Sequence, residues 1–160
     1  MNQRTNKIVL VVGGRGTGKT TYLENHVPTR AVVVEYFKTD RYKDFERRVN
    51  YDNFKLQEAV NRTVILEDAT QLIIGGGGLK LRRLAVSCKQ LGSDVFIVFH
   101  STNFVPPFLY ALFDYMILWR SEAPKKSAKL AAYYDEICKI LSKKLPKKHQ
   151  WRPLGVVRQV

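Results

Sequence analysis

Eight residues near the start of the chain, 13–20, have the composition of a phosphate-binding loop. They read Gly-Gly-Arg-Gly-Thr-Gly-Lys-Thr. Glycines at this spacing let the backbone curl so that several N–H groups point inward at an anion. Lys19 would reach the β- and γ-phosphates of a nucleotide, and the Thr20 hydroxyl would be a ligand for Mg²⁺.

The context of this loop matches the P-loop or Walker A motif, which requires a strand before it and a helix after it. The apolar run 8–12 precedes the loop, and residues 21–26 can begin a helix whose N–H groups and dipole favour anions. We therefore expect ATP and Mg²⁺ as cofactors. The predicted nucleotide-binding residues are Gly13, Gly14, Arg15, Gly16, Thr17, Gly18, Lys19, Thr20 and Thr21.

Two carboxylates, Glu67 and Asp68, end the apolar strand expected at 63–68. In P-loop NTPases one such carboxylate holds the Mg²⁺ shell and its neighbour orients or deprotonates the attacking water. We assign Glu67 mainly to the metal shell and Asp68 mainly to the water. The reverse assignment stays open, as does a structural role as a helix cap or ion pair. Thr20, Glu67 and Asp68 are the predicted metal-site residues.

Two further candidates for catalysis follow later apolar runs. His100 ends the run 94–99, where its side chain could touch the γ-phosphate or its water, although a structural histidine is the alternative. Arg120 ends the run 115–119 and leads the candidates for an arginine finger acting in a neighbouring subunit. Together with Lys19, Glu67 and Asp68 they complete the predicted catalytic set.

The order of strands and helices predicts the fold class. Strands are expected at 7–12, 31–37, 63–68, 94–99 and 115–119, with helices or connections between them. This alternation is typical of an α/β fold, a three-layer P-loop NTPase domain with a mainly parallel sheet of about five strands. Because nucleotides bind at the carboxyl ends of such strands, the loop, the acids, His100 and Arg120 should gather at one edge.

The composition changes after residue 120. Residues 121–160 hold ten Lys or Arg against three Asp or Glu, a net charge of +7. An amphipathic helix is expected at about 127–144, followed by an extended tail after Pro146. We therefore divide the chain into a P-loop ATPase core, 1–120, and a basic helical segment with a tail, 121–160.

The net charge of +13 is larger than ATP alone requires and suits a polyanion, which releases counterions when it binds. A solvated basic surface is the alternative, and the tract Gly75–Gly78 is read first as a flexible connection. The predicted nucleic-acid contacts are Lys80, Arg82, Arg83, Lys125, Lys126, Lys143, Lys144, Lys147 and Lys148.

Size and hydropathy favour one domain without a membrane span. The chain has 160 residues, no apolar run near the ~20 residues of a membrane helix, and a polar start without a signal-peptide core. Cys88 and Cys138 match no metal spacing, so we expect free thiols. The expected location is the cytoplasm, of a host cell if the protein is viral, with association with a virion also open.

Three stretches together resemble the HerA/FtsK superfamily of P-loop ATPases, especially the small genome-packaging ATPases of viruses. They are 13–20, 64–68 and the long stretch 88–120. The resemblance implies a homo-oligomeric ring of five or six subunits that pumps double-stranded DNA, with capsid or portal proteins as further partners. The chain departs from the family where many members have Asp-Glu instead of Glu67-Asp68, and Gln where His100 or Ser101 stands.

The leading hypothesis is therefore an ATP-hydrolysing motor that translocates double-stranded DNA and packages a viral or mobile-element genome. One alternative is a small-molecule or nucleoside kinase, with Arg41, Arg47 and Arg48 available for a lid. Another is a non-hydrolysing, ATP-gated DNA-binding assembly factor. The sequence leaves open the ring size, the direction of movement and the choice between DNA and RNA.

Overall fold

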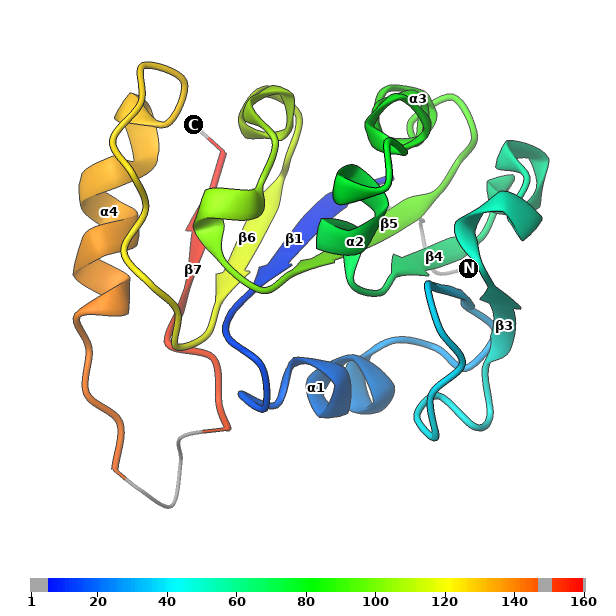
Figure 1. Cartoon of the computed structure of the whole chain (residues 1–160), viewed down its shortest axis with the longest axis horizontal. Coiled ribbons are helices and arrows are strands. Elements are labelled where there is room, and N and C mark those ends of the chain that lie inside the picture. The colour runs from blue at the N-terminus through cyan, green and yellow to red at the C-terminus, as the bar shows by residue number, and fades with distance from the viewer. Residues whose placement is uncertain (1–5, 147–150, 160) are drawn as a thin grey trace.

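A computed structural model of the chain describes residues 6–146 and 151–159. These residues form three layers, a central sheet with helices on both faces (Figure 1). The sheet has the strand order β3-β2-β4-β5-β1-β6-β7, and every pair is parallel except β6 with β7. The strands are β1 Ile8–Val12, β2 Val32–Glu35, β3 Glu46–Val49, β4 Thr63–Leu66, β5 Asp94–Phe99, β6 Tyr115–Leu118 and β7 Gly155–Arg158. The predicted α/β fold with a mainly parallel sheet is confirmed, with seven strands in the described residues where about five were expected.

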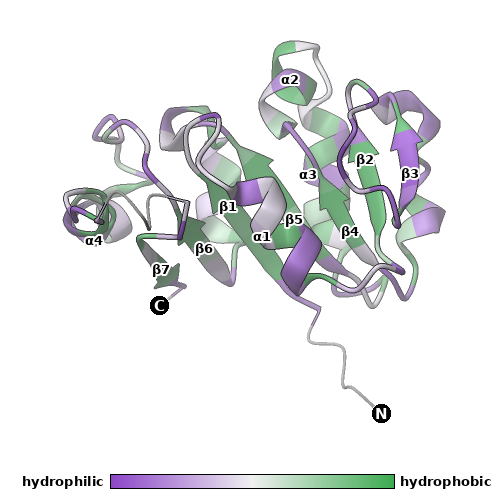
Figure 2. Cartoon of the chain, turned by 90° about the horizontal axis from the view of Figure 1, so that it is seen from below, coloured by the Kyte–Doolittle hydropathy of each residue, from purple (hydrophilic) through white to green (hydrophobic). Residues whose placement is uncertain are grey.

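The two faces of the sheet bury alternate residues of the same strands. Val9 and Val11 of β1 pack toward α1, Lys19–His26, in one apolar cluster. Leu10 and Val12 belong to the other cluster. That cluster also contains residues of α2, Ala69–Ile74, α3, Gly78–Ser87, and α4, Ala131–Leu141. Figure 2 shows the central strands as the hydrophobic part of the molecule, as expected for strands covered on both faces.

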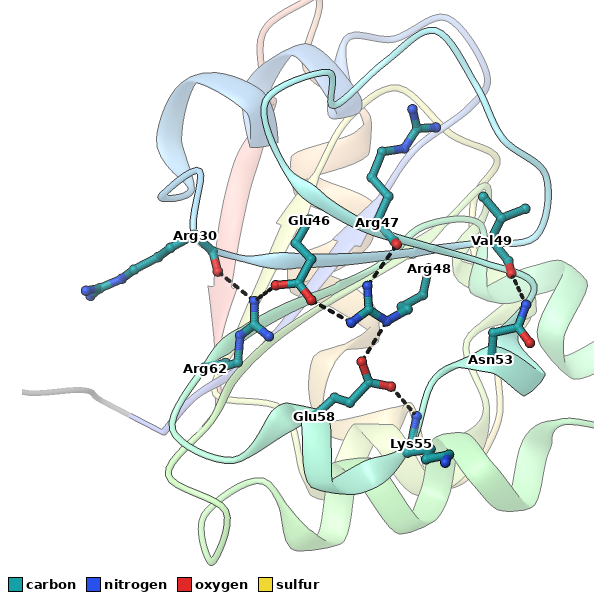
Figure 3. A network of polar contacts seen from close by, with 9 residues as sticks. All are labelled: Arg30, Glu46, Arg47, Arg48, Val49, Asn53, Lys55, Glu58 and Arg62. Carbon is teal, nitrogen blue, oxygen red and sulfur yellow. Dashed lines mark hydrogen bonds and ion pairs between the residues drawn. The ribbon is translucent and has the colours of Figure 1, made fainter.

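Strand β3 lies between the expected strands 31–37 and 63–68, where only helices or connections were expected. Two 3₁₀ helices are present, Tyr51–Asn53 and Leu56–Ala59, but β3 adds an edge strand beside β2. Arg48 contacts Glu46 at 2.5 Å and Glu58 at 2.6 Å, and Arg62 also contacts Glu46 (Figure 3). Charged side chains on an exposed edge are a common protection against edge-to-edge pairing.

The C-terminal segment completes the opposite edge of the sheet. Strand β7 pairs antiparallel with β6, with Met116 opposite Val157. Helix α4 is shorter than the expected 127–144, and it buries Tyr133, Ile137 and Ile140 in the larger cluster. The boundary at residue 120 stays a prediction, and segments on both sides of it share one sheet and one core.

Within residues 6–146 and 151–159, no helix combines the length and apolar character needed to cross a membrane. Cys88 is buried and Cys138 is half-buried, and both are free thiols.

Candidate active site

Four parallel strands end beside one another at the edge where the predicted site residues lie. Strand β1 is paired with β5 and with β6, and β5 is paired with β4. Val12 lies opposite Phe99 and Leu118, so the segments that follow these three residues leave the sheet at the same level. Helices α1 and α2 begin from this edge (Figure 1).

The P-loop is anchored between the ends of β5 and β6. The Gly13 N–H donates to the Phe99 carbonyl at 3.1 Å, and the Gly14 N–H donates to the Arg120 carbonyl at 2.7 Å. A Cβ atom on Gly13 would lie 2.5 Å from the Cβ of Trp119, closer than side-chain atoms approach. Glycine is required here because the loop runs directly against β6.

Lys19 is folded back into the loop that precedes it. Its side chain is buried, and Nζ donates to the carbonyls of Gly13 at 2.5 Å and Gly14 at 2.7 Å. Burial lowers the pKa of Lys19 to about 8, although the Glu67 and Asp68 carboxylates act in the opposite direction. The loop therefore holds one cationic group within its own curl, close to both acids.

Glu67 and Thr20 face each other across the space between β4 and α1. The Thr20 hydroxyl donates to Glu67 Oε1 at 2.7 Å, whereas Glu67 Oε2 is buried and has no hydrogen-bond partner among the described residues. Burial raises the pKa of the Glu67 carboxyl, and the hydrogen bond from Thr20 and the charge of Lys19 oppose that shift. The Glu67 backbone is fixed by its N–H to the Val34 carbonyl at 2.9 Å.

These oxygens suit Mg²⁺, which prefers hard oxygen ligands and is usually held by one or two carboxylates together with substrate phosphates and water. An orphaned carboxylate oxygen beside a hydroxyl offers such ligands. In the described part of the chain, no group of three or more His, Cys, Asp and Glu could hold a metal ion. The protein would therefore supply a partial shell, Thr20 and Glu67, and not a closed metal site.

Asp68 and His100 form a second pair next to the first. His100 Nε2 lies 3.1 Å from Asp68 Oδ1, and both side chains are about one-quarter exposed. Asp68 has a φ of 53°, in the left-handed region that residues other than glycine rarely adopt. Such backbone strain is kept where the surrounding structure fixes it, which is common at functional sites. Ser101, the other polar residue considered at this strand end, is buried and accepts from the Asn103 N–H.

Arg120 is exposed and lies at the same edge, because its carbonyl holds Gly14. Its assignment as a finger stays a prediction, since it requires a second subunit. Arg41 lies behind the P-loop, donating to the Thr21 hydroxyl at 2.8 Å and contacting Glu24 at 2.5 Å.

Three aromatic residues border the site without having been predicted as parts of it. The Tyr51 hydroxyl donates to the Glu67 carbonyl. Tyr42 is buried beside Thr20 and Glu67, its N–H donates to Glu24 Oε1 at 2.7 Å, and burial raises the pKa of its hydroxyl. Trp151 packs against Gly18 of the loop. Tyr51 begins a single 3₁₀ turn, and Tyr42 and Trp151 lie outside helices and strands, so no periodicity in the sequence could have placed them there.

The predicted nucleic-acid contacts differ in how far their side chains are exposed and in which protein groups they contact. Lys80 is half-buried and Nζ donates to the Tyr51 carbonyl, so it supports the fold next to Glu67. The Arg82 guanidinium lies over the Phe108 ring at 5.9 Å, and Lys126 Nζ lies 5.7 Å from the Tyr134 ring. The exposed members are Arg82, Arg83, Lys125, Lys126, Lys143 and Lys144, while Lys147 and Lys148 lie outside the described residues.

A hollow of about 890 Å³ opens between the ends of β2 and β4 and the turn from α2 to α3. Its wall includes Tyr36, Phe37, Tyr51, Lys80 and Arg83. Phe37 is 72% exposed. The hollow is large enough for a small ligand.

No protein-family model matches the sequence, and no curated protein matches it. Among solved structures, the chain is similar to the genome packaging NTPase B204 from Sulfolobus turreted icosahedral virus 2 in complex with ATPγS. The identity is 15% and the TM-score 0.65, over 90% of this chain and 89% of that one. For the complex of the same NTPase with AMP, the identity is 16% and the TM-score 0.64, over 90% of each chain. B204, the DNA-packaging ATPase from Sulfolobus turreted icosahedral virus, gives 10% identity, a TM-score of 0.57 and 90% of each chain.

At these identities the similarity shows the fold. The chain has the P-loop NTPase fold found in the packaging ATPase B204, over nearly the whole length of both proteins.

Proposed function

We propose that this protein is an ATP-hydrolysing motor that translocates double-stranded DNA, in the packaging of a viral or mobile-element genome. The observation that carries the proposal is the meeting of Lys19, the Thr20–Glu67 pair and the Asp68–His100 pair at one edge of the sheet. The fold shared with a genome packaging NTPase supports it, as does the HerA/FtsK-like arrangement of motifs.

Each residue at this edge has a role in hydrolysis. The P-loop N–H groups and Lys19 bind the β- and γ-phosphates, and Thr20 with Glu67 would hold Mg²⁺. The ion, when bound, neutralises charge on the phosphate oxygens. Asp68 orients the attacking water and accepts its proton, and His100, 3.1 Å from Asp68 Oδ1, fixes the direction of that carboxylate.

Movement along DNA requires a grip that does not depend on base sequence. The exposed basic side chains named above, on a chain of net charge +13, suit contacts to the phosphate backbone. A ring of five or six subunits would bring Arg120 of one subunit to the nucleotide of the next. Capsid or portal proteins are the further partners, and the host cytoplasm or the virion is the location that this function requires.

The test is ATP hydrolysis with and without double-stranded DNA, at one stated salt concentration. Wild-type protein should hydrolyse ATP faster with DNA, and Lys19→Ala should lose hydrolysis under both conditions. Lys89→Ala is the matched control, because this exposed lysine precedes β5 and lies at the opposite edge of the sheet. Hydrolysis that DNA does not change would overturn the motor, and absence of hydrolysis by wild type would favour the ATP-gated assembly factor.

A kinase remains the second candidate because the hollow lined by Tyr36, Tyr51 and Lys80 could take a small phosphate acceptor. A kinase lid would need arginines that are available to a substrate, but two of the three arginines expected for it are held in ion pairs within the protein. Arg47 donates from Nε to buried Glu35 at 2.7 Å, and Arg48 pairs with Glu46 and Glu58. Transfer of labelled phosphate from ATP to a nucleoside, faster than to water, would establish the kinase and exclude the motor.

A further inference from the structure

The order of strands in the sheet indicates how a bound nucleotide lies across strand β1. Glu67, Asp68 and His100 follow β4 and β5, on one side of β1. If ATP occupies the P-loop as the proposed function requires, its γ-phosphate lies on that side. The nucleoside end must then lie on the other side of β1, over β6 and β7.

Trp151 meets the end of the P-loop on the β6 and β7 side, next to Trp119 and Arg120. A Cβ atom on Gly18 would lie 2.5 Å from the Trp151 carbonyl oxygen and 3.2 Å from Trp151 Cβ. The same carbonyl accepts a hydrogen bond from Trp119 Nε1 at 3.1 Å, and the Trp119 side chain is fully buried. The backbone of Trp151 is therefore fixed against the start of α1.

The Trp151 side chain remains 55% exposed although its backbone is packed. The Arg152 guanidinium lies over the indole at 5.1 Å. The indole therefore presents part of its surface outside the core, on a backbone that is held in place. An indole face offers a nucleobase a stacking surface, to which a neighbouring arginine adds a cation–π contribution.

We propose that Trp151 forms the base-binding subsite of the nucleotide site, stacking on the nucleobase of the bound nucleoside triphosphate. The phosphates are held by the P-loop and Lys19, and the base is held by the indole. Stacking is tolerant of base identity, because every base has a π-face. The subsite therefore raises affinity for nucleotides over free polyphosphate and selects weakly between bases.

The substitution Trp151→Ala separates this function from packing, because alanine keeps the carbonyl oxygen and the Cβ atom that contact Gly18 and Trp119. Affinities are measured for ATP and for inorganic tripolyphosphate, which has no base. Trp151→Ala should weaken ATP binding about tenfold and leave tripolyphosphate binding unchanged. Trp151→Phe should retain most of the affinity for ATP. Phe37→Ala is the control for loss of an exposed aromatic ring, and it should change neither affinity.

Fluorescence gives an independent readout. Stacking of a base on Trp151 should quench the intrinsic emission when ATP is added, and this change should disappear in Trp151→Phe, where buried Trp119 is the remaining tryptophan. Unchanged ATP affinity in Trp151→Ala, or equal losses for ATP and tripolyphosphate, would overturn the subsite. The subsite and the motor can fail separately. If wild-type protein binds ATP more tightly than tripolyphosphate through Trp151, but its ATP hydrolysis does not change with DNA, the motor is overturned and the subsite is supported.

Discussion

The two sides of strand β1 contribute different things to the candidate site. On the β5 and β4 side lie the charged groups, with Thr20 hydrogen-bonded to Glu67 and His100 beside Asp68. On the β6 and β7 side the contacts are made by backbone and aromatic groups, where the Arg120 carbonyl accepts from the Gly14 N–H and Trp151 packs against Gly18. One side is equipped for phosphate chemistry and the other for holding the loop and the nucleoside.

This contrast predicts that substitutions on the two sides affect different quantities. Changes to Asp68 or His100 on the acid side should lower turnover with little effect on nucleotide affinity or stability. Changes on the aromatic side should alter affinity or the free energy of unfolding.

Asp68→Asn should have the largest effect. It removes the proton acceptor while keeping the size of the side chain, so kcat for ATP hydrolysis should fall about 10²–10⁴-fold with ATP affinity nearly unchanged. Steady-state kinetics and equilibrium binding test it, with Asp135→Asn at an exposed position of α4 as the matched control. If Glu67→Gln lowers kcat further than Asp68→Asn and keeps Mg²⁺-dependent binding, the two acids have the reverse roles.

The pH dependence of phosphate binding should show an intermediate effect. Burial places the pKa of Lys19 at about 8, so in the free protein the side chain loses its charge as the pH rises through 8. Phosphate requires the charged form, and binding above pH 8 must therefore take up a proton. The loss of charge on Lys19 should lower tripolyphosphate affinity about twofold from pH 7 to 8 and then by up to about tenfold per pH unit. Calorimetry in buffers of different ionisation enthalpy measures the proton uptake.

Lys19→Gln supplies the control for this pH dependence. Its binding should be weaker and should lack the added loss above pH 8. The same slope in Lys19→Gln and wild type would show that another group titrates.

Gly13→Ala should have the smallest effect on chemistry and a measurable one on stability. The new methyl group would meet Trp119 Cβ at 2.5 Å, and overpacking of this kind costs about 1–3 kcal/mol. Denaturant unfolding should report a lower midpoint with an unchanged slope. Gly78→Ala is the control, because no heavy atom lies within 4 Å of its added Cβ. Equal stability of both variants would contradict the close approach of the P-loop to β6.

The parts of the molecule that the sequence predicts are those with a local signal. Strand β5 has the predicted bounds, because its run of apolar residues is buried on both faces and is bounded by Gly92 and His100. The P-loop is recognisable because its spacing is set by the phosphate group it curls around. Helix α3 has a local signal of the same kind, because Leu81, Leu84 and Ala85 are spaced as on one face of a helix and are buried in the structure.

The parts that escaped prediction depend on contacts distant in sequence. Strand β3 carries Glu46, Arg47 and Arg48, which resemble a solvated loop until they pair with Glu58 and Glu35. Strand β7 becomes a strand because β6 offers it an open edge. The placement of Trp151 beside Gly18 depends on that pairing, so it could not be inferred before the fold was known.

The measurement that tests the central claim most directly is ATP-driven displacement of a third strand from a DNA triplex by the protein moving along the duplex. Wild-type protein should displace the strand only when ATP is present, and Asp68→Asn, which still binds ATP, should not displace it. Displacement by Asp68→Asn equal to that by wild type, or its absence when wild type hydrolyses ATP on the same DNA, would contradict a motor powered by this site.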